Sequence, residues 1–255
     1  MARLFRGFTL PLCGALALAA CSAQPGAATG ETVEAPAEQE LRPLAIMTSL
    51  PILWGEGDIG DMLASDAAPN PVRAALETRF TLSPIDRLTE LDDQPFLLLA
   101  QPRALAGDEN VALDDWVRAG GQVLILADPM LTAESAYGLG DKRAPLMMTM
   151  LSPILARWGL SLTFDPASSP KQAMVAGVPP IPVQRPGSLS LTGEGHDSSC
   201  EIKREGLIAE CRIGAGRALI VADAAMVENG DDAGEVAISA LSALMAEAFT
   251  DETGD

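Results

Sequence analysis

The chain lacks the side chains on which most hydrolytic active sites depend. Its 255 residues include one histidine, His196, in a polar segment from Thr192 to Ser199. Catalysis by a serine or cysteine nucleophile needs an imidazole held beside that nucleophile. No Gly-x-Ser-x-Gly or Gly-x-Cys-x-Gly turn is present, nor is His-Glu-x-x-His or Cys-x-x-Cys. We therefore expect no catalytic triad, no metal site and no cofactor.

Basic residues are also scarce. The sequence has 17 lysines and arginines against 35 aspartates and glutamates, a formal net charge of −18. Without residues 1–20, which contain Arg3 and Arg6 and no acid, 15 basic and 35 acidic residues remain, a net charge of −20. Such a chain repels the phosphates of nucleic acids and of anionic lipid headgroups. Nucleic acid is thus excluded as a partner.

Long apolar segments are missing as well, and the N-terminus has a short one. Basic residues at Arg3 and Arg6 precede the segment Gly7–Ala20, which is apolar apart from Thr9 and is too short to span a bilayer. A signal peptide has this layout. Leu18-Ala-Ala-Cys21-Ser22 resembles the lipobox of bacterial lipoproteins, whereas the alternative is an ordinary secretory signal with an incidental cysteine.

The lipobox resemblance implies a location. Residues 1–20 would be removed, and Cys21 would carry acyl chains such as palmitate that hold the protein on a bilayer. Ser22 after this cysteine favours the outer membrane over the inner membrane in that family. We expect a lipid-anchored protein of the cell envelope that faces the periplasm.

Composition divides the rest of the chain. Residues 21–41 are small, acidic and aperiodic, which predicts a flexible tether, and residues 250–255 predict a disordered acidic tail. Residues 42–249 are long enough for a single domain. Within them, residues 165–199 are rich in Pro, Ser and Gly and are interpreted as an excursion from that domain.

Strand and helix signals alternate along residues 42–249. Continuous apolar segments separated by helices indicate a parallel sheet covered on both faces. We therefore predict an α/β fold: a doubly wound, mostly parallel sheet with a C-terminal β-hairpin. The expected strands are 44–50, 80–85 (at an edge), 96–100, 122–127, 160–164 and 217–222, and the expected helices include 71–79 capped by Asn70, a helix capped by Asp108, and 235–249.

Cys200 and Cys211 flank an expected hairpin. A turn at Glu205-Gly206 places the two cysteines opposite each other, at a separation that a disulfide tolerates. Export favours oxidation, so we predict a Cys200–Cys211 bond. Two buried free thiols are the alternative. The Gly214-Ala-Gly216 segment precedes a strand, which indicates a turn and not a dinucleotide-binding loop.

Polar residues follow several apolar strands. In an open parallel sheet, ligands bind beyond the carboxyl ends of the strands. A ligand or partner site is therefore one interpretation of these residues, and capping of the following helix or turn is the other. The candidates are Thr48, Ser49, Gln101, Asp128 and Asp223.

Four segments together resemble a known family. They are Thr48-Ser-Leu-Pro51, Phe96-Leu-Leu-Leu-Ala-Gln-Pro102, Leu113-Asp-Asp-Trp-Val-Arg-Ala-Gly-Gly-Gln-Val-Leu-Ile-Leu-Ala-Asp-Pro129 and Gly214-Ala-Gly-Arg-Ala-Leu-Ile-Val-Ala-Asp-Ala224. They look like the GldG-like auxiliary domain of uncharacterised ABC-type transport systems, over residues 42–249. The resemblance implies a fold similar to class I glutamine amidotransferases without their chemistry.

Two departures qualify what the resemblance implies. GldG-like proteins usually have transmembrane helices, whereas this chain has a lipobox and no later apolar span. An active amidotransferase would place a cysteine after a central strand, where this chain has Gln101 or Asp128. We expect a non-enzymatic component that binds envelope or transporter proteins. The alternatives are a hydrolase that uses Asp128 and Asp223 and a structural lipoprotein without a ligand.

Overall fold

The structure, a computed structural model, describes residues 41–54, 70–91, 93–138, 140–169, 171–228 and 234–250. They belong to one compact unit, Gln39–Asp255. The predicted signal peptide, the predicted lipidation site Cys21, Ser22 and the acidic residues 251–255 lie outside the described residues. Of the predicted tether, only Leu41 is described.

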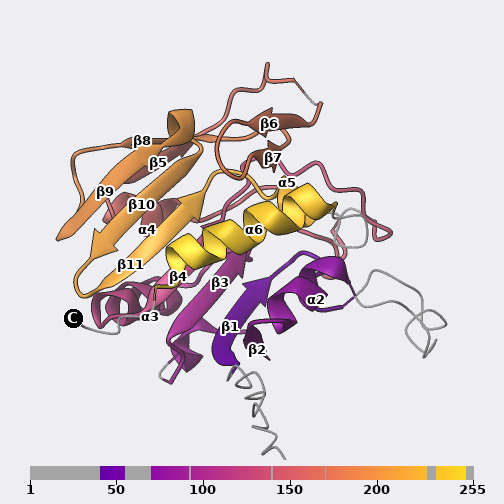
Figure 1. The fold of residues 1–255 in the computed structure, drawn as a ribbon. Coiled ribbons are helices and arrows are strands. Elements are labelled where there is room, and N and C mark those ends of the chain that lie inside the picture. The colour runs from indigo at the N-terminus through magenta and orange to yellow at the C-terminus, as the bar shows by residue number, and fades with distance from the viewer. Residues whose placement is uncertain are drawn as a thin grey trace, which may run out of the picture. The chain divides into compact units, whose positions relative to one another are not determined.

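A seven-stranded sheet forms the centre of this unit (Figure 1). Five neighbouring strands are parallel, and the last two continue the sheet as antiparallel neighbours. In spatial order they are β2 (Phe80–Pro84), β1 (Arg42–Thr48), β3 (Phe96–Ala100), β4 (Gln122–Leu126), β11 (Gly216–Val221), β10 (Ile208–Ile213) and β9 (Ser198–Lys203). The mostly parallel sheet, the edge position of β2 and the C-terminal hairpin are as predicted.

Helices cover both faces of the sheet, which is why the central strands are continuously apolar. One face is covered by α2 (Pro71–Glu77), α5 (Ala225–Glu228) and α6 (Glu235–Ala248), and the other by α3 (Gly107–Arg118) and α4 (Ser152–Arg157) (Figure 1). All five residues of β3 are buried. Two short 3-10 helices, η1 (Leu88–Glu90) and η2 (Arg204–Gly206), lie in the connections.

Residues 160–191 form two small antiparallel sheets outside the main sheet. In one, β5 (Leu160–Thr163) pairs with β8 (Ser188–Leu191), and in the other β6 (Ala173–Val175) pairs with β7 (Ile181–Val183). The strand predicted at 160–164 therefore exists but lies apart from the main sheet. Its alternating Leu and Ser or Thr residues suit a half-exposed pair and not a fully covered sheet.

One predicted helix cap is confirmed and another is wrong. Asn70 caps α2, because its Oδ1 accepts hydrogen bonds from the backbone N–H groups of Val72 and Arg73 at 2.9 and 3.1 Å. Asp108 is not the cap of α3, which already begins at Gly107. Glu109 acts at that end instead, since its carboxylate accepts from the N–H of Ala106 at 2.9 Å.

Gly214-Ala-Gly216 forms the turn between β10 and β11, as predicted. Gly214 has φ +57°, and a Cβ on Gly216 would lie 2.0 Å from the carbonyl oxygen of Val117 at the end of α3. Only glycine permits this approach. The glycines thus allow a helix end to pack against the hairpin.

The Cys200–Cys211 disulfide is present across β9 and β10. The two residues are direct partners in the ladder, with Cα atoms 4.0 Å apart, and they close a loop with a sequence separation of 11. This confirms the predicted pairing. Among the described helices, none combines the length and apolar character that crossing a bilayer requires.

Removing this bond should destabilise the protein. The double variant Cys200→Ser, Cys211→Ser is expected to lose about 2–3 kcal/mol of unfolding free energy, because closing a loop of this size restricts the unfolded chain. Urea denaturation of the oxidised wild type and the double variant measures the difference. A reducing agent should lower the stability of the wild type to that of the variant and leave the variant unchanged; equal stability in all four conditions would contradict the prediction.

Candidate functional site

The predicted strand-end residues come together at the carboxyl edge of the parallel strands. Thr48 ends β1 and Ser49 follows it. Gln101, Asp128 and Asp223 follow β3, β4 and β11, which are consecutive neighbours in the sheet. The expected convergence follows from the topology, because the carboxyl ends of parallel strands lie at one edge.

Gln101 joins three segments at this edge. Its side-chain Nε2 donates to the carbonyls of Asp128 and Leu146 at 3.0 and 2.8 Å, and its Oε1 accepts from the N–H of Asp128 at 2.9 Å. Its backbone φ is +45°, a conformation that residues other than glycine rarely adopt. The amide is fully buried, so it serves the protein's own backbone.

Ser49 links the same loops, whereas Thr48 bonds only locally. The Ser49 hydroxyl donates to the carbonyl of Gln101 at 2.6 Å and accepts from the N–H of Leu146 at 3.1 Å. Thr48 Oγ1 accepts from the N–H of Leu50 at 2.9 Å. The Thr48 hydroxyl thus stabilises the turn after β1, whereas the Ser49 hydroxyl joins that turn to the segments at Gln101 and Leu146.

Asp128 and Asp223 also accept from backbone N–H groups. The oxygens of Asp128 accept from Met130 at 2.7 Å and Ala224 at 3.4 Å. Those of Asp223 accept from Gln184 at 2.9 Å and Ala225 at 2.7 Å. Both side chains are 0 % exposed. The capping interpretation therefore describes their observed contacts.

A third carboxylate, Glu228 at the end of α5, adds charge to this region. Burial, with the nearby charge of Glu228, raises the pKa of Asp128 to about 7. Burial, with the charge of Asp128, raises the pKa of Asp223 well above its usual value. Burial also raises the pKa of Glu228. We call Asp128, Asp223 and Glu228 the carboxylate cluster, in which burial favours the protonated form of each side chain.

The carboxylate cluster does not form a metal centre in the described residues. No three His, Cys, Asp or Glu side chains there are arranged to hold a metal ion. One oxygen of Glu228, Oε1, is buried without a hydrogen-bond partner, while Oε2 accepts from the Thr132 hydroxyl at 3.4 Å. A proton on Glu228 would lower the cost of burying it.

Sequence reasoning missed two buried acids on α3. Glu109 is 1 % exposed and forms a bidentate ion pair with Arg103 at 2.6 and 2.7 Å, and the hydrogen bonds from Arg103 lower its pKa to about 2. Asp114 is 5 % exposed and bonds Arg118, Arg157 and Trp158. The position of Asp114 between Leu113 and Val117, which the sequence places on the apolar face, could have indicated its burial. A buried carboxylate needs hydrogen-bond or ion-pair partners.

Comparison with known proteins supplies a fold and no family. No family model and no curated protein matches the chain. Among solved structures, the chain is similar to the mmIFT52 N-terminal domain, at 12% identity and a TM-score of 0.52, over 84% of this chain and 100% of that one. This likeness shows a shared fold alone.

Two further solved structures are similar at lower scores. The exo-β-1,4-mannosidase Op5Man5 from Opitutaceae bacterium strain TAV5 is 13% identical, with a TM-score of 0.46 over 80% of this chain and 36% of that one. A ThuA-like protein from Bacteroides uniformis is 11% identical, with a TM-score of 0.41, over 87% of this chain and 98% of that one. The chain thus spans about a third of the mannosidase.

Proposed function

We propose that the protein is a non-enzymatic binding component of an envelope transport system, anchored to a membrane through acylated Cys21. The lipobox-like sequence supports the anchor, and the GldG-like segments support the transport role. Both stand on sequence resemblance. The structure describes the α/β domain, and its polar residues bear on whether this domain binds a partner or catalyses a reaction.

The burial of the strand-end polar groups is the observation that carries a non-catalytic role. Gln101, Asp128 and Asp223 are fully buried and bonded to main-chain groups. Gln101 has a strained backbone after a central strand, where an amidotransferase-like enzyme would place its cysteine. An amide at that turn is no nucleophile. The edge that would hold a substrate is thus filled by side chains that bind the protein's own loops.

An exposed methionine loop supports a partner-binding role. We use this name for Met147, Met148 and Met150, which are 43 %, 61 % and 60 % exposed. They lie beside the carboxyl edge, since the neighbouring Leu146 contacts Ser49 and Gln101. Methionine is adaptable and is frequent at protein-binding surfaces, and exposed apolar residues in a group indicate interaction sites. The fitting occupant is an apolar face of an envelope protein.

A carboxylate-dependent hydrolase is the second candidate. The observation in its favour is the raised pKa of Asp128, about 7, because catalytic acids have such values. Against it, neither Asp128 nor Asp223 is exposed to a substrate. Under the hydrolase hypothesis, the purified protein should hydrolyse envelope glycans or esters and Asp128→Asn with Asp223→Asn should abolish this activity, whereas the non-enzymatic role predicts no hydrolysis by the wild type or the double variant.

Loss of the anchor should release the protein from the membrane. Cys21→Ala is expected to move the protein from the membrane fraction to the soluble fraction, because the acyl chains would be its stable bilayer contact. Immunoblotting of fractionated cells measures this. Ser22→Asp is the matched control: it keeps the acylated cysteine and should shift the protein from the outer to the inner membrane. Retention of Cys21→Ala on the membrane would reject the proposed anchor.

Crosslinking tests the partner. A photoreactive residue at Met148 should capture an envelope transport protein in living cells, while the same residue at Val111 on α3, which is 59 % exposed, should not. Adducts identified by mass spectrometry give the readout. Equal capture at both positions, or none at Met148, would contradict a partner at this loop and favour a structural lipoprotein.

A further inference from the structure

One row of side chains crosses four strands on the open face of the hairpin. Ser199 of β9 pairs with Arg212 of β10, Arg212 with Arg217 of β11, and Arg217 with Gln122 of β4. Residues paired directly across a sheet point to the same face. The row thus presents a hydroxyl, two guanidinium groups and an amide, all of which donate hydrogen bonds. We call these four residues the donor row.

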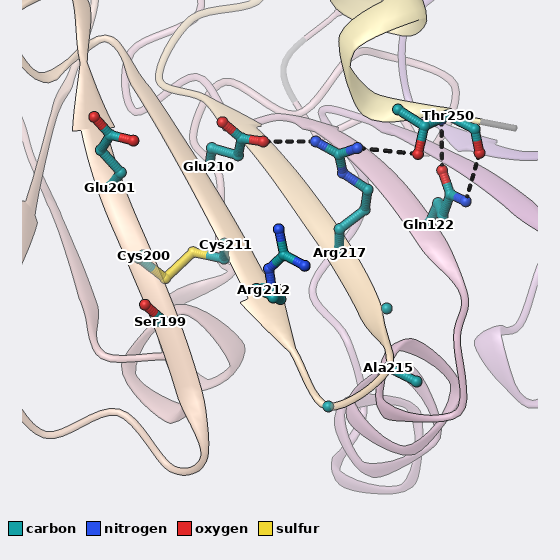
Figure 2. A pocket seen from close by; sticks show the side chains of 12 residues that line it. Gln122, Ser199, Cys200, Glu201, Glu210, Cys211, Arg212, Ala215, Arg217 and Thr250 are labelled. Atoms are coloured by element: carbon teal, nitrogen blue, oxygen red, sulfur yellow. Dashed lines mark hydrogen bonds and ion pairs between the residues drawn. A yellow bond between two sulfur atoms is a disulfide. The ribbon is translucent and has the colours of Figure 1, made fainter. Parts of the chain in front are cut away.

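The donor row lines a groove of about 600 Å³ (Figure 2). Thr250, just after α6, borders it at the Gln122 end: Gln122 Nε2 donates to the Thr250 carbonyl at 2.9 Å, and Gln122 Oε1 accepts from the Thr250 N–H at 2.8 Å. These bonds fix one end of the groove. The other end reaches Ser199 on β9, the edge strand.

The two arginines of the row differ in their partners. Arg217 donates to Glu210 Oε1 at 2.5 Å and to the Thr250 hydroxyl at 3.1 Å. Arg212 is exposed, and its guanidinium group makes no hydrogen bond or ion pair with the described residues; in Figure 2 no dashed line reaches it. Like charges that face each other directly across a sheet repel. Arg212 is therefore the arginine of the row without a counterion among the described residues, in a chain with a net charge of −18.

The carboxylates of the groove do not neutralise Arg212. Glu210 is fully engaged, since Oε1 accepts from Arg217 and Oε2 accepts from Lys203 at 2.5 Å. Hydrogen bonding to Lys203 lowers the pKa of Glu210 accordingly. Glu201, which faces Glu210 in the ladder, lies in the groove but forms no ion pair with Arg212 within 4.0 Å. An anion beside Arg212 would supply the counterion that the described residues do not.

We propose that the donor row is a binding site for a small ligand with a carboxylate or phosphate group, held chiefly by Arg212 and Ser199. The planar guanidinium matches both oxoanions. The disulfide at Cys200–Cys211 is a positioning element, because it adjoins the Ser199–Arg212 pair and fixes its register. This site adds a ligand class to the proposed binding role, and its biological meaning rests on that proposed function. It needs neither the anchor nor the methionine loop.

Titration of the full-length chain with inorganic phosphate and with acetate tests the site. Side-chain N–H signals of arginine, followed by NMR, should show saturable shifts at Arg212, identified by its absence in Arg212→Gln. That variant should weaken binding about tenfold, as expected for loss of a charge-assisted hydrogen bond. Arg73→Gln on α2, beside the opposite sheet edge, should leave binding unchanged. The tighter of the two probes identifies the oxoanion class.

A gain-of-binding variant guards against misfolding as an explanation. Glu201→Gln removes a competing negative charge from the groove and should tighten binding about threefold at low salt. Unsaturable shifts, or equal affinity in the wild type, Arg212→Gln and Glu201→Gln, would overturn the site. Such a failure with an intact crosslink at Met148 leaves the proposed function standing. Phosphate binding without membrane retention or crosslinking would reject the function and keep the site.

Discussion

Replacing Asp128 with asparagine is expected to stabilise the protein at neutral and alkaline pH and to have little effect in acid. The pKa of Asp128 is raised from 3.8 to about 7 in the folded state, first by burial and then by the charge of Glu228. The folded protein thus retains a proton that the unfolded chain releases near its ordinary pKa. Asparagine cannot ionise, so it avoids this penalty; its one oxygen can keep the 2.7 Å bond from Met130, and only the longer 3.4 Å bond from Ala224 is lost.

The sign and size of the effect follow from linkage. Because the folded-state pKa is the higher one, the stabilisation by protonated Asp128 is complete below about pH 4 and is lost as the pH rises through about 7. A shift of one pKa unit corresponds to about 1.4 kcal/mol, so the change between these limits is about 4 kcal/mol. The unfolding free energy of Asp128→Asn relative to wild type should rise by that order between about pH 4 and pH 8.

Urea denaturation across this pH range measures the difference. Subtracting the wild-type curve from the variant curve removes the contribution of Glu109, whose lowered pKa acts in the opposite direction, because its stabilisation is lost as the pH falls through about 2. The exposed Asp115 on α3 offers a matched control, and Asp115→Asn should run parallel to wild type. Parallel curves for Asp128→Asn would mean that Asp128 is charged in the folded protein at neutral pH.

Truncating Asp114 to alanine should destabilise the protein by about 3 kcal/mol, since removing one member of a buried ion pair leaves its partners unsatisfied. Asp114 Oδ2 accepts from Arg118 and Arg157 at 2.9 and 3.0 Å, and Oδ1 accepts from the indole N–H of Trp158 at 2.9 Å. Trp158 is 1 % exposed, so its N–H would lose its partner inside the core. The partial exposure of Arg157 moderates the loss.

Asp114 also connects elements that are distant in sequence. Arg118 donates to the carbonyls of His196 and Asp197, so the network joins α3, α4 and the segment before β9. Burial alone would raise the pKa of Asp114, but hydrogen bonds from Arg118, Trp158 and Arg157 outweigh it and lower the pKa. The charge therefore contributes stability at neutral pH, which is lost as the pH falls through this lowered pKa.

Two variants separate charge from hydrogen bonding at this site. Asp114→Asn keeps an acceptor for Trp158 and should lose about half as much stability as Asp114→Ala. Asp115→Ala, one position along the same helix, should change stability by less than about 0.5 kcal/mol because its side chain is exposed. Thermal and urea unfolding give the comparison. If Asp114→Ala, Asp114→Asn and Asp115→Ala lost equal amounts of unfolding free energy, the buried network around Asp114 would contribute no stability beyond the helix propensity of each residue.

Sequence patterns predicted most of the central sheet. Apolar residues predict strands at 96–100 and 122–127, which the structure has as Phe96–Ala100 and Gln122–Leu126, and the expected turn at Glu205-Gly206 places Cys200 opposite Cys211. The strand at 160–164 is predicted without its pairing partner. Local periodicity reveals a strand, but partner choice depends on contacts with Ser188–Leu191, far along the chain.

The sequence predicted which strand-end residues lie together, but it did not predict what their side chains contact. Polar residues after apolar strands had to converge, because parallel strands end at one edge. Whether such residues face a ligand or the protein's own loops depends on how later segments cover that edge. Leu146 and Gln184 supply main-chain partners to Gln101 and Asp223, and nothing in the local sequence of either strand announces them.

By itself, the amino-acid sequence determined most strands and helices of the main sheet, the hairpin register that allows the disulfide, and the presence of a single histidine. These properties follow from periodicity, turn chemistry and composition, which act over a few residues. Only the tertiary structure decided that Asp128, Asp223 and Glu228 share one buried region, and that Ser199, Arg212, Arg217 and Gln122 line one groove. Burial and electrostatic environment arise when segments distant in the chain exclude water together, so they follow from packing and not from local pattern.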